Sequence, residues 1–190
     1  MSSSVSAVIA DLKSQVQRME GPAARWPMPT HPVLAELPEL RSGGTYCVQS
    51  PSLAMLVMAG PSAAGAWSAV VGVPHFGIEA ARGFGVNTDR LVCVPEVTSG
   101  EMLSVLAALV DVVDVIVMPP MSVTPKEAAR LTARMREKHC LIVTWGSWPQ
   151  ADAQIGWSEV QWKGIGAGYG NLHARQVTLE VSRGGRAAGS

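Results

Sequence analysis

The chain has 190 residues, of which 47% are hydrophobic, and its 15 Lys and Arg residues balance 15 Asp and Glu residues. This length is typical of one domain with a core of its own. High hydrophobicity without net charge excludes an intrinsically disordered chain and argues against a generally basic nucleic-acid-binding protein. A surface with few charges and no net charge favours association with a partner.

Residues 1–20 are predicted to form an amphipathic helix that ends at Gly21-Pro22. Its apolar residues are spaced four, three, four and three positions apart, as in the seam of a coiled coil. The seam consists of Val5, Ile9, Leu12, Val16 and Met19. A helix of about two heptads is too short to be stable alone in water, so it must pack on its own domain, on a partner or on a second copy.

Residues 21–44 are rich in proline and are predicted to be a linker, and residues 184–190 a flexible tail. Between them, residues 45–183 alternate between strand and helix patterns, which predicts an α/β domain with a mostly parallel sheet flanked by helices. Two further strands, 155–162 and 174–182, follow each other without a helix and predict a terminal antiparallel pair. The predicted strands are 45–49, 66–71, 91–94, 114–118 and 140–145, and the predicted helices are 52–64, 78–83, 99–110 and 124–138.

The N-terminus lacks the features of a signal peptide, and the longest apolar runs are too short to span a bilayer, so we expect a cytoplasmic protein without membrane contact. Cys47, Cys93 and Cys140 lie in separate apolar runs and are expected to be buried, reduced thiols. Neither the cysteines nor the four histidines have metal-binding spacing, so no metal site is expected.

A parallel sheet can bind a nucleotide at the junction of its first strand and helix, which here reads QSPSLA over residues 49–54. A phosphate-binding loop requires glycines, a lysine and a hydroxyl side chain, and this junction lacks the glycines and the lysine. The buried strand 114–118 ends at Met118, where a carboxylate would hold a hydrated metal ion. Pro74 stands near the position of a water-orienting glutamate. We therefore expect no enzymatic activity and no cofactor.

The last third of the chain leaves DNA contact as an alternative, because residues 121–190 carry nine basic and five acidic side chains. A glycine-rich stretch, 164–170, precedes a strand rather than a helix and is predicted to be a hairpin loop, not a dinucleotide site. The candidate DNA-binding residues are Lys163, Arg175, Arg183 and Arg186.

Four tryptophans lie within 18 residues of one another, at positions 145, 148, 157 and 162. They are interpreted either as core and edge packing or as an aromatic interface, since tryptophan is favoured at binding hot spots. Trp157 and Trp162 are five residues apart, which places them on opposite faces of a regular strand.

The order of several motifs resembles RecA-type recombinases. Residues 85–91 (GVNTDRL) and 91–101 (LVCVPEVTSGE) are similar to consecutive segments of that family, ending at a helix start. Residues 113–117 (VDVIV) resemble the strand that normally ends in the metal-binding aspartate, and 177–185 (VTLEVSRGG) resemble a closing strand. The resemblance covers about two thirds of the chain and implies a RecA-like core over residues 45–183.

Because the nucleotide-binding residues are missing, the chain most resembles the ImuA family and its shorter form, ImuA′. This resemblance implies an accessory protein of damage-induced translesion DNA synthesis. The implied partner is an ImuB-type Y-family polymerase homologue, in an assembly with an error-prone C-family DNA polymerase and a sliding clamp. By analogy with RecA, the 5/9/12/16/19 seam is the expected partner contact. Self-association, a nucleotide-gated regulator and a single-stranded-DNA-binding protein are the alternatives.

Overall fold

The computed structural model describes residues 25–37, 39–163 and 174–183. The predicted N-terminal helix with its seam, the glycine-rich loop and the tail that contains Arg186 lie outside the described residues.

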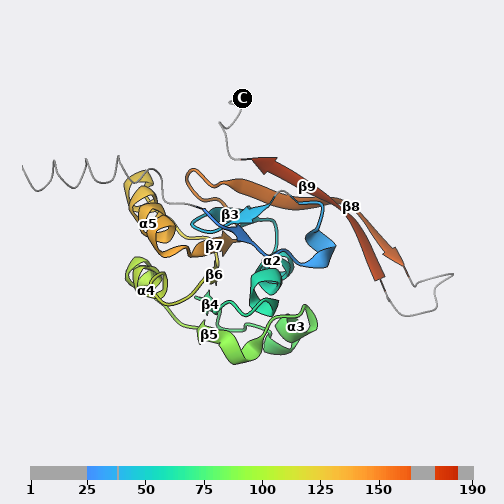
Figure 1. The fold of residues 1–190 in the computed structure, drawn as a ribbon, viewed down its shortest axis with the longest axis horizontal. Coiled ribbons are helices and arrows are strands. Elements are labelled where there is room, and N and C mark those ends of the chain that lie inside the picture. Colours follow the sequence, from blue (N-terminus) through green and yellow to red (C-terminus); the bar gives the residue numbers. More distant parts are fainter. Residues whose placement is uncertain (1–24, 38, 164–173, 184–190) are drawn as a thin grey trace, which may run out of the picture.

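The core of the protein is a seven-stranded sheet with the strand order β5-β4-β6-β7-β3-β8-β9 (Figure 1). Every adjacent pair of strands is parallel except the last, in which β9 runs antiparallel to β8. The predicted class, a mostly parallel α/β sheet with a terminal antiparallel pair, is confirmed. The strands are β3 (Thr45–Val48), β4 (Ser68–Val71), β5 (Leu91–Val94), β6 (Val115–Met118), β7 (Leu141–Thr144), β8 (Ala153–Lys163) and β9 (Ala174–Arg183).

Helices cover the two faces of the parallel part of the sheet. On one face lie α2 (Pro51–Ala63) and α3 (Ile78–Gly83), and on the other α4 (Met102–Leu109) and α5 (Pro125–Lys138) (Figure 1). The central strand β6 is buried at all four positions because successive side chains enter opposite cores. Its odd-numbered valines pack on the α2 side, and its Ile and Met on the α4–α5 side.

Capping residues set where the helices begin. Thr124 and Glu127 form a complete capping box at the start of α5, with Pro125 at the first helical position. Helix α4 begins at Met102, later than predicted. The preceding turn is closed by Glu101, whose carboxylate accepts a hydrogen bond of 2.6 Å from the Thr98 hydroxyl.

Part of the proline-rich stretch predicted to be a linker packs against the domain. Strands β1 (Pro27–Met28) and β2 (Leu40–Arg41) pair antiparallel, and a 3-10 turn, η1 (Pro32–Leu34), lies between them. Leu34 and Leu40 are fully buried in the core on the α2 face. Residues 25–44 therefore belong to the folded domain, because they bury apolar side chains in it.

The ribbon formed by β8 and β9 contains a bulge between Trp157 and Trp162. The register slips between Ser158 and Gln161, where β8 has one residue more than β9. Trp157 pairs with Leu179 and Trp162 with Arg175, and these two partners are four residues apart on β9. A bulge of this kind interrupts the regular alternation on which the prediction of opposite faces depends, so the five-residue spacing alone does not assign the two tryptophans to faces of the ribbon.

The cysteines divide into two groups. Cys47 and Cys140 are buried, as predicted, whereas Cys93 is exposed. The expectation was wrong for Cys93 because it lies on β5, an edge strand of the sheet. Among the described residues, no helix is both long enough and apolar enough to cross a membrane.

Candidate functional site

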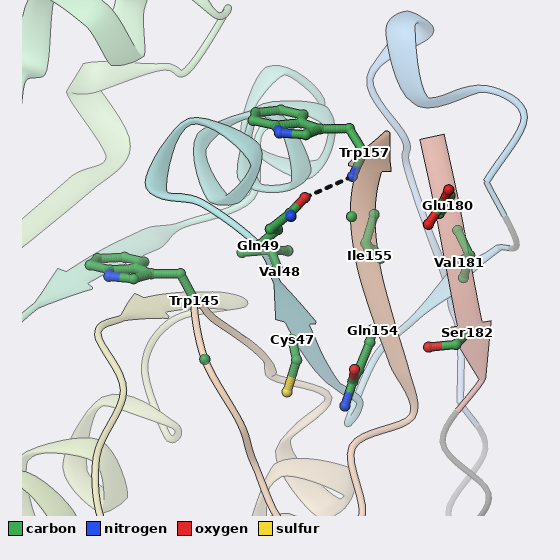
Figure 2. Close-up of a pocket in the computed structure, with 12 residues that line it drawn as sticks. Cys47, Val48, Gln49, Trp145, Gln154, Ile155, Trp157, Glu180, Val181 and Ser182 are labelled. Carbon is green, nitrogen blue, oxygen red and sulfur yellow. Dashed lines mark hydrogen bonds between the residues drawn. The ribbon is translucent and has the colours of Figure 1, made fainter. Parts of the chain in front are cut away.

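A groove of about 580 Å³ lies at the carboxyl ends of β3 and β7 and extends across β8 and β9 (Figure 2). Ligands of open α/β sheets bind at this edge, beyond the carboxyl ends of parallel strands. The side chains that shape the groove are Cys47, Gln49, Trp145, Gln154, Trp157, Glu180 and Ser182. None of them is among the site residues predicted from the sequence.

At the β3–α2 junction, where RecA-type enzymes would hold phosphates, the polar groups are already engaged. The Ser50 hydroxyl caps α2 by accepting a hydrogen bond from the Leu53 backbone N–H at 3.3 Å. Pro51, at the first helical position, has no N–H to donate. The Gln49 side-chain oxygen accepts from the Trp157 backbone N–H at 3.0 Å, as Figure 2 shows. The junction is a capped helix start tied to β8, not an open cradle of N–H groups.

The carboxyl ends of the neighbouring strands are apolar. Met118, at the end of β6, is fully buried in the core on the α4–α5 side. After β4, a side chain on Gly72 would meet Met102 at 2.8 Å and Pro119 at 3.4 Å. After β7, a side chain on Gly146 would meet Pro120 at 2.7 Å. Apolar packing thus fills the place where a metal-binding carboxylate would stand, whereas Pro74, near the position of the water-orienting glutamate, is exposed.

The groove itself has acidic, amide and aromatic character. Glu180 is its only Asp, Glu, Lys or Arg among the described residues, and it is exposed on β9 opposite Gly156. Gln154 and Ser182 are also exposed, and Figure 2 shows them on adjacent strands with their polar ends in the groove. Burial raises the pKa of the Cys47 thiol, so it stays protonated and neutral at physiological pH.

Two tryptophans flank the end of β3. Trp145 and Trp157 are partly buried and pack against the core on the α2 face, on either side of Gln49 in Figure 2. Trp148, by contrast, is buried in the core on the other face. Three of the four clustered tryptophans thus contribute to core packing, and two of these also line the groove, whereas an aromatic interface stays a prediction.

The candidate DNA-binding residues do not form one cluster along the β8–β9 ribbon. Lys163 and Arg175 belong to neighbouring pairs at one end of the ribbon, whereas Arg183 pairs with Ala153 at the other. Arg175 and Arg183 are eight residues apart on β9, which corresponds to about 26 Å of extended strand. The predicted partner-binding seam, residues 5–19, lies outside the described residues.

The groove residues are hard to find from the sequence because they come from four separate strands or strand ends. Glu180 and Ser182 lie in a strand that reads as ordinary alternation, and Gln154 lies one residue before a predicted strand. Only the tryptophan cluster gave a signal, through its density.

Comparison with known proteins defines the family. The model of the MT3502 N-terminal domain matches residues 33–150, more than half of the chain, and the chain belongs to this family. The uncharacterized protein Rv3395c of Mycobacterium tuberculosis is 36% identical over 107 residues, which cover 55% of this chain and 52% of that protein. The chain thus matches about half the length of this relative. Among solved structures, the crystal structure of SulA from Pseudomonas aeruginosa matches 55% of this chain and 98% of its own, at 14% identity and a TM-score of 0.45.

Proposed function

We propose that this protein is a non-catalytic accessory protein of damage-induced translesion DNA synthesis that binds an ImuB-type Y-family polymerase homologue. The ordered motifs that resemble RecA-type proteins and the ImuA family support the biological role. The single structural observation that supports a binding role is the composition of the carboxyl edge. Met118 and the proline after it stand where a metal-binding carboxylate is required, and the β3–α2 junction is a capped helix start.

The proposed contact is the seam of Val5, Ile9, Leu12, Val16 and Met19. Its heptad spacing matches the way in which one helix packs against another, and the seam is too short to be stable without a partner surface. A charge introduced into such a seam would have to be buried on binding, which is strongly unfavourable.

The test is a pull-down of the ImuB-type partner by the full chain. The seam variant is Ile9→Glu/Leu12→Glu. The matched control is Gln15→Glu/Gln17→Glu, which adds the same two charges away from the seam, and circular dichroism monitors the fold of all three proteins. We expect the wild type and the control to retain the partner and the seam variant to lose it. Equal retention by a folded seam variant would refute the seam as the contact, and no retention by the wild type would refute the proposed function.

A further inference from the structure

We propose that the groove across β3, β7, β8 and β9 binds a basic side chain, Arg or Lys, carried by an extended segment of a protein partner. It would be a second contact surface, separate from the N-terminal seam. The inference deepens the proposed function by giving the chemistry of a partner segment, but the groove can be tested without that partner.

The charge of the groove is complementary to that of a basic side chain. Glu180 places a negative charge in the groove, and no Lys or Arg is among the described residues that line it. A phosphate group would therefore meet repulsion without a compensating cation, whereas a guanidinium or ammonium group would be attracted. Because Glu180 is exposed on β9, its carboxylate can accept charge-assisted hydrogen bonds from an incoming cation.

Nearby basic residues do not offset this charge inside the groove. Arg25 and Arg41 line a separate hollow with Tyr46, whose ring packs in the core on the α2 face. Arg25 forms an ion pair of 2.6 Å with Asp152, and Arg41 one of 2.6 Å with Glu39. Glu180 belongs to the opposite face of the sheet, since its cross-strand partner Gly156 alternates with residues that face the α2 core.

Amide and hydroxyl groups give the groove further features of a peptide site. Trp145 lines the groove at the end of β7, but its ring packs against the core on the α2 face and points away from Glu180 in Figure 2. The Gln154 amide and the Ser182 hydroxyl provide donors and acceptors for a peptide backbone on adjacent strands. Gly156 lies on β8 opposite Glu180, and the Gln49 side chain occupies the space beside it, since an added Cβ atom would meet the Gln49 oxygen at 3.3 Å. A volume of about 580 Å³ accommodates one long side chain with its flanking backbone.

The probe is the capped tripeptide acetyl-Gly-Arg-Gly-amide, titrated into the full chain and followed by two-dimensional NMR. Its matched control is the same peptide with citrulline in place of arginine, which keeps the shape and removes the charge. The protein variants are Glu180→Lys and, as a control away from the groove, Glu36→Lys. Glu36 is exposed and is not among the residues that line the groove.

We expect saturable shifts centred on Gln154, Gly156 and Ser182 with the arginine peptide, and none with the citrulline peptide. Glu180→Lys should raise the dissociation constant of the arginine peptide about tenfold or more, because a charge-assisted hydrogen bond is lost. Glu36→Lys should leave this dissociation constant unchanged. Equal binding of both peptides, or an unchanged affinity of folded Glu180→Lys, would overturn the proposal. So would absence of saturable shifts, or saturable shifts of the groove residues by magnesium ATP or a thymidine oligonucleotide, which would assign the groove to phosphates.

The peptide titration and the pull-down test separate claims, so each can be refuted without the other. If the partner is not retained by the wild type but the arginine peptide binds, the proposed function is refuted and the groove inference stands. If the partner is retained but the peptide does not bind, the groove inference alone is refuted.

Discussion

The substitution Gly60→Ala in α2 tests how the N-terminal segment is held on the domain. A Cβ atom at this position would lie 2.5 Å from the Pro29 carbonyl oxygen, 2.6 Å from the His31 nitrogen and 2.8 Å from the Thr30 carbonyl carbon. Ordinary van der Waals contact begins at 3.4 Å, so the segment or the helix must move by about an ångström. All three neighbours are backbone atoms, so the overlap cannot be relieved by a change of side-chain rotamer.

Two opposing effects determine how far Gly60→Ala changes the free energy of unfolding. Alanine is favoured over glycine in a helix interior by about 1 kcal/mol. Overpacking costs about 1–3 kcal/mol, and lifting the segment would also expose the fully buried Leu34, whose burial contributes about 1.5–3 kcal/mol. We therefore expect a net loss of about 1.5–5 kcal/mol in the free energy of unfolding.

Urea unfolding followed by circular dichroism measures this loss, and Gly83→Ala is the matched control. Gly83 ends helix α3, and an added Cβ atom there would meet nothing within 4 Å among the described residues. We expect Gly83→Ala to leave stability unchanged or to raise it by up to about 1 kcal/mol. If Gly60→Ala is as stable as Gly83→Ala, the packing of residues 29–31 on α2 is refuted.

Three further predictions concern single side chains. Thr124→Ala should lower the free energy of unfolding by about 1 kcal/mol, because it removes the capping box of α5. Hydrogen bonds from the Thr124 hydroxyl and backbone lower the pKa of Glu127, so their contribution is complete above the carboxyl's ordinary pKa and is lost as pH falls through the lower native value. In thermal melts, the difference between wild type and Thr124→Ala should shrink with acidification; a constant difference would contradict this. The Thr144 hydroxyl is fully buried without a hydrogen-bond partner among the described residues, so Thr144→Val should not destabilise the protein and should stabilise it by up to about 1 kcal/mol in urea unfolding. In the native protein a thiol reagent should modify Cys93 and spare the two buried cysteines, as mass spectrometry of the labelled peptides can show; labelling of all three would contradict the described burial.

Local patterns were sufficient to predict most elements of the parallel sheet. The β-branched run at residues 115–117 matches a central strand, and Thr124 followed by Pro125 matches the start of α5. These features depend on residues close together in the chain, so a short window of sequence contains the whole physical cause.

Features that depend on distant partners were not predicted. Leu34 and Leu40 stand among prolines and turn residues, and only their fit against α2 makes them core. The bulge after Ser158 has no distinctive local signal, yet it changes the pairing of every later residue in β8. Glu180 reads as an ordinary exposed strand residue, and the sequence does not show that it faces the hollow beside Gly156.

The most direct test of the central claim is calorimetric titration of the full chain with the purified ImuB-type partner, in the presence and absence of magnesium ATP. The account predicts saturable binding with the same dissociation constant in both conditions, because the β3–α2 junction is a capped helix start that lacks the glycines and the lysine of a phosphate-binding loop. A tenfold change in that constant corresponds to a coupling of about 1.4 kcal/mol between nucleotide and partner. Such a change would contradict the account, as would absence of binding in both conditions.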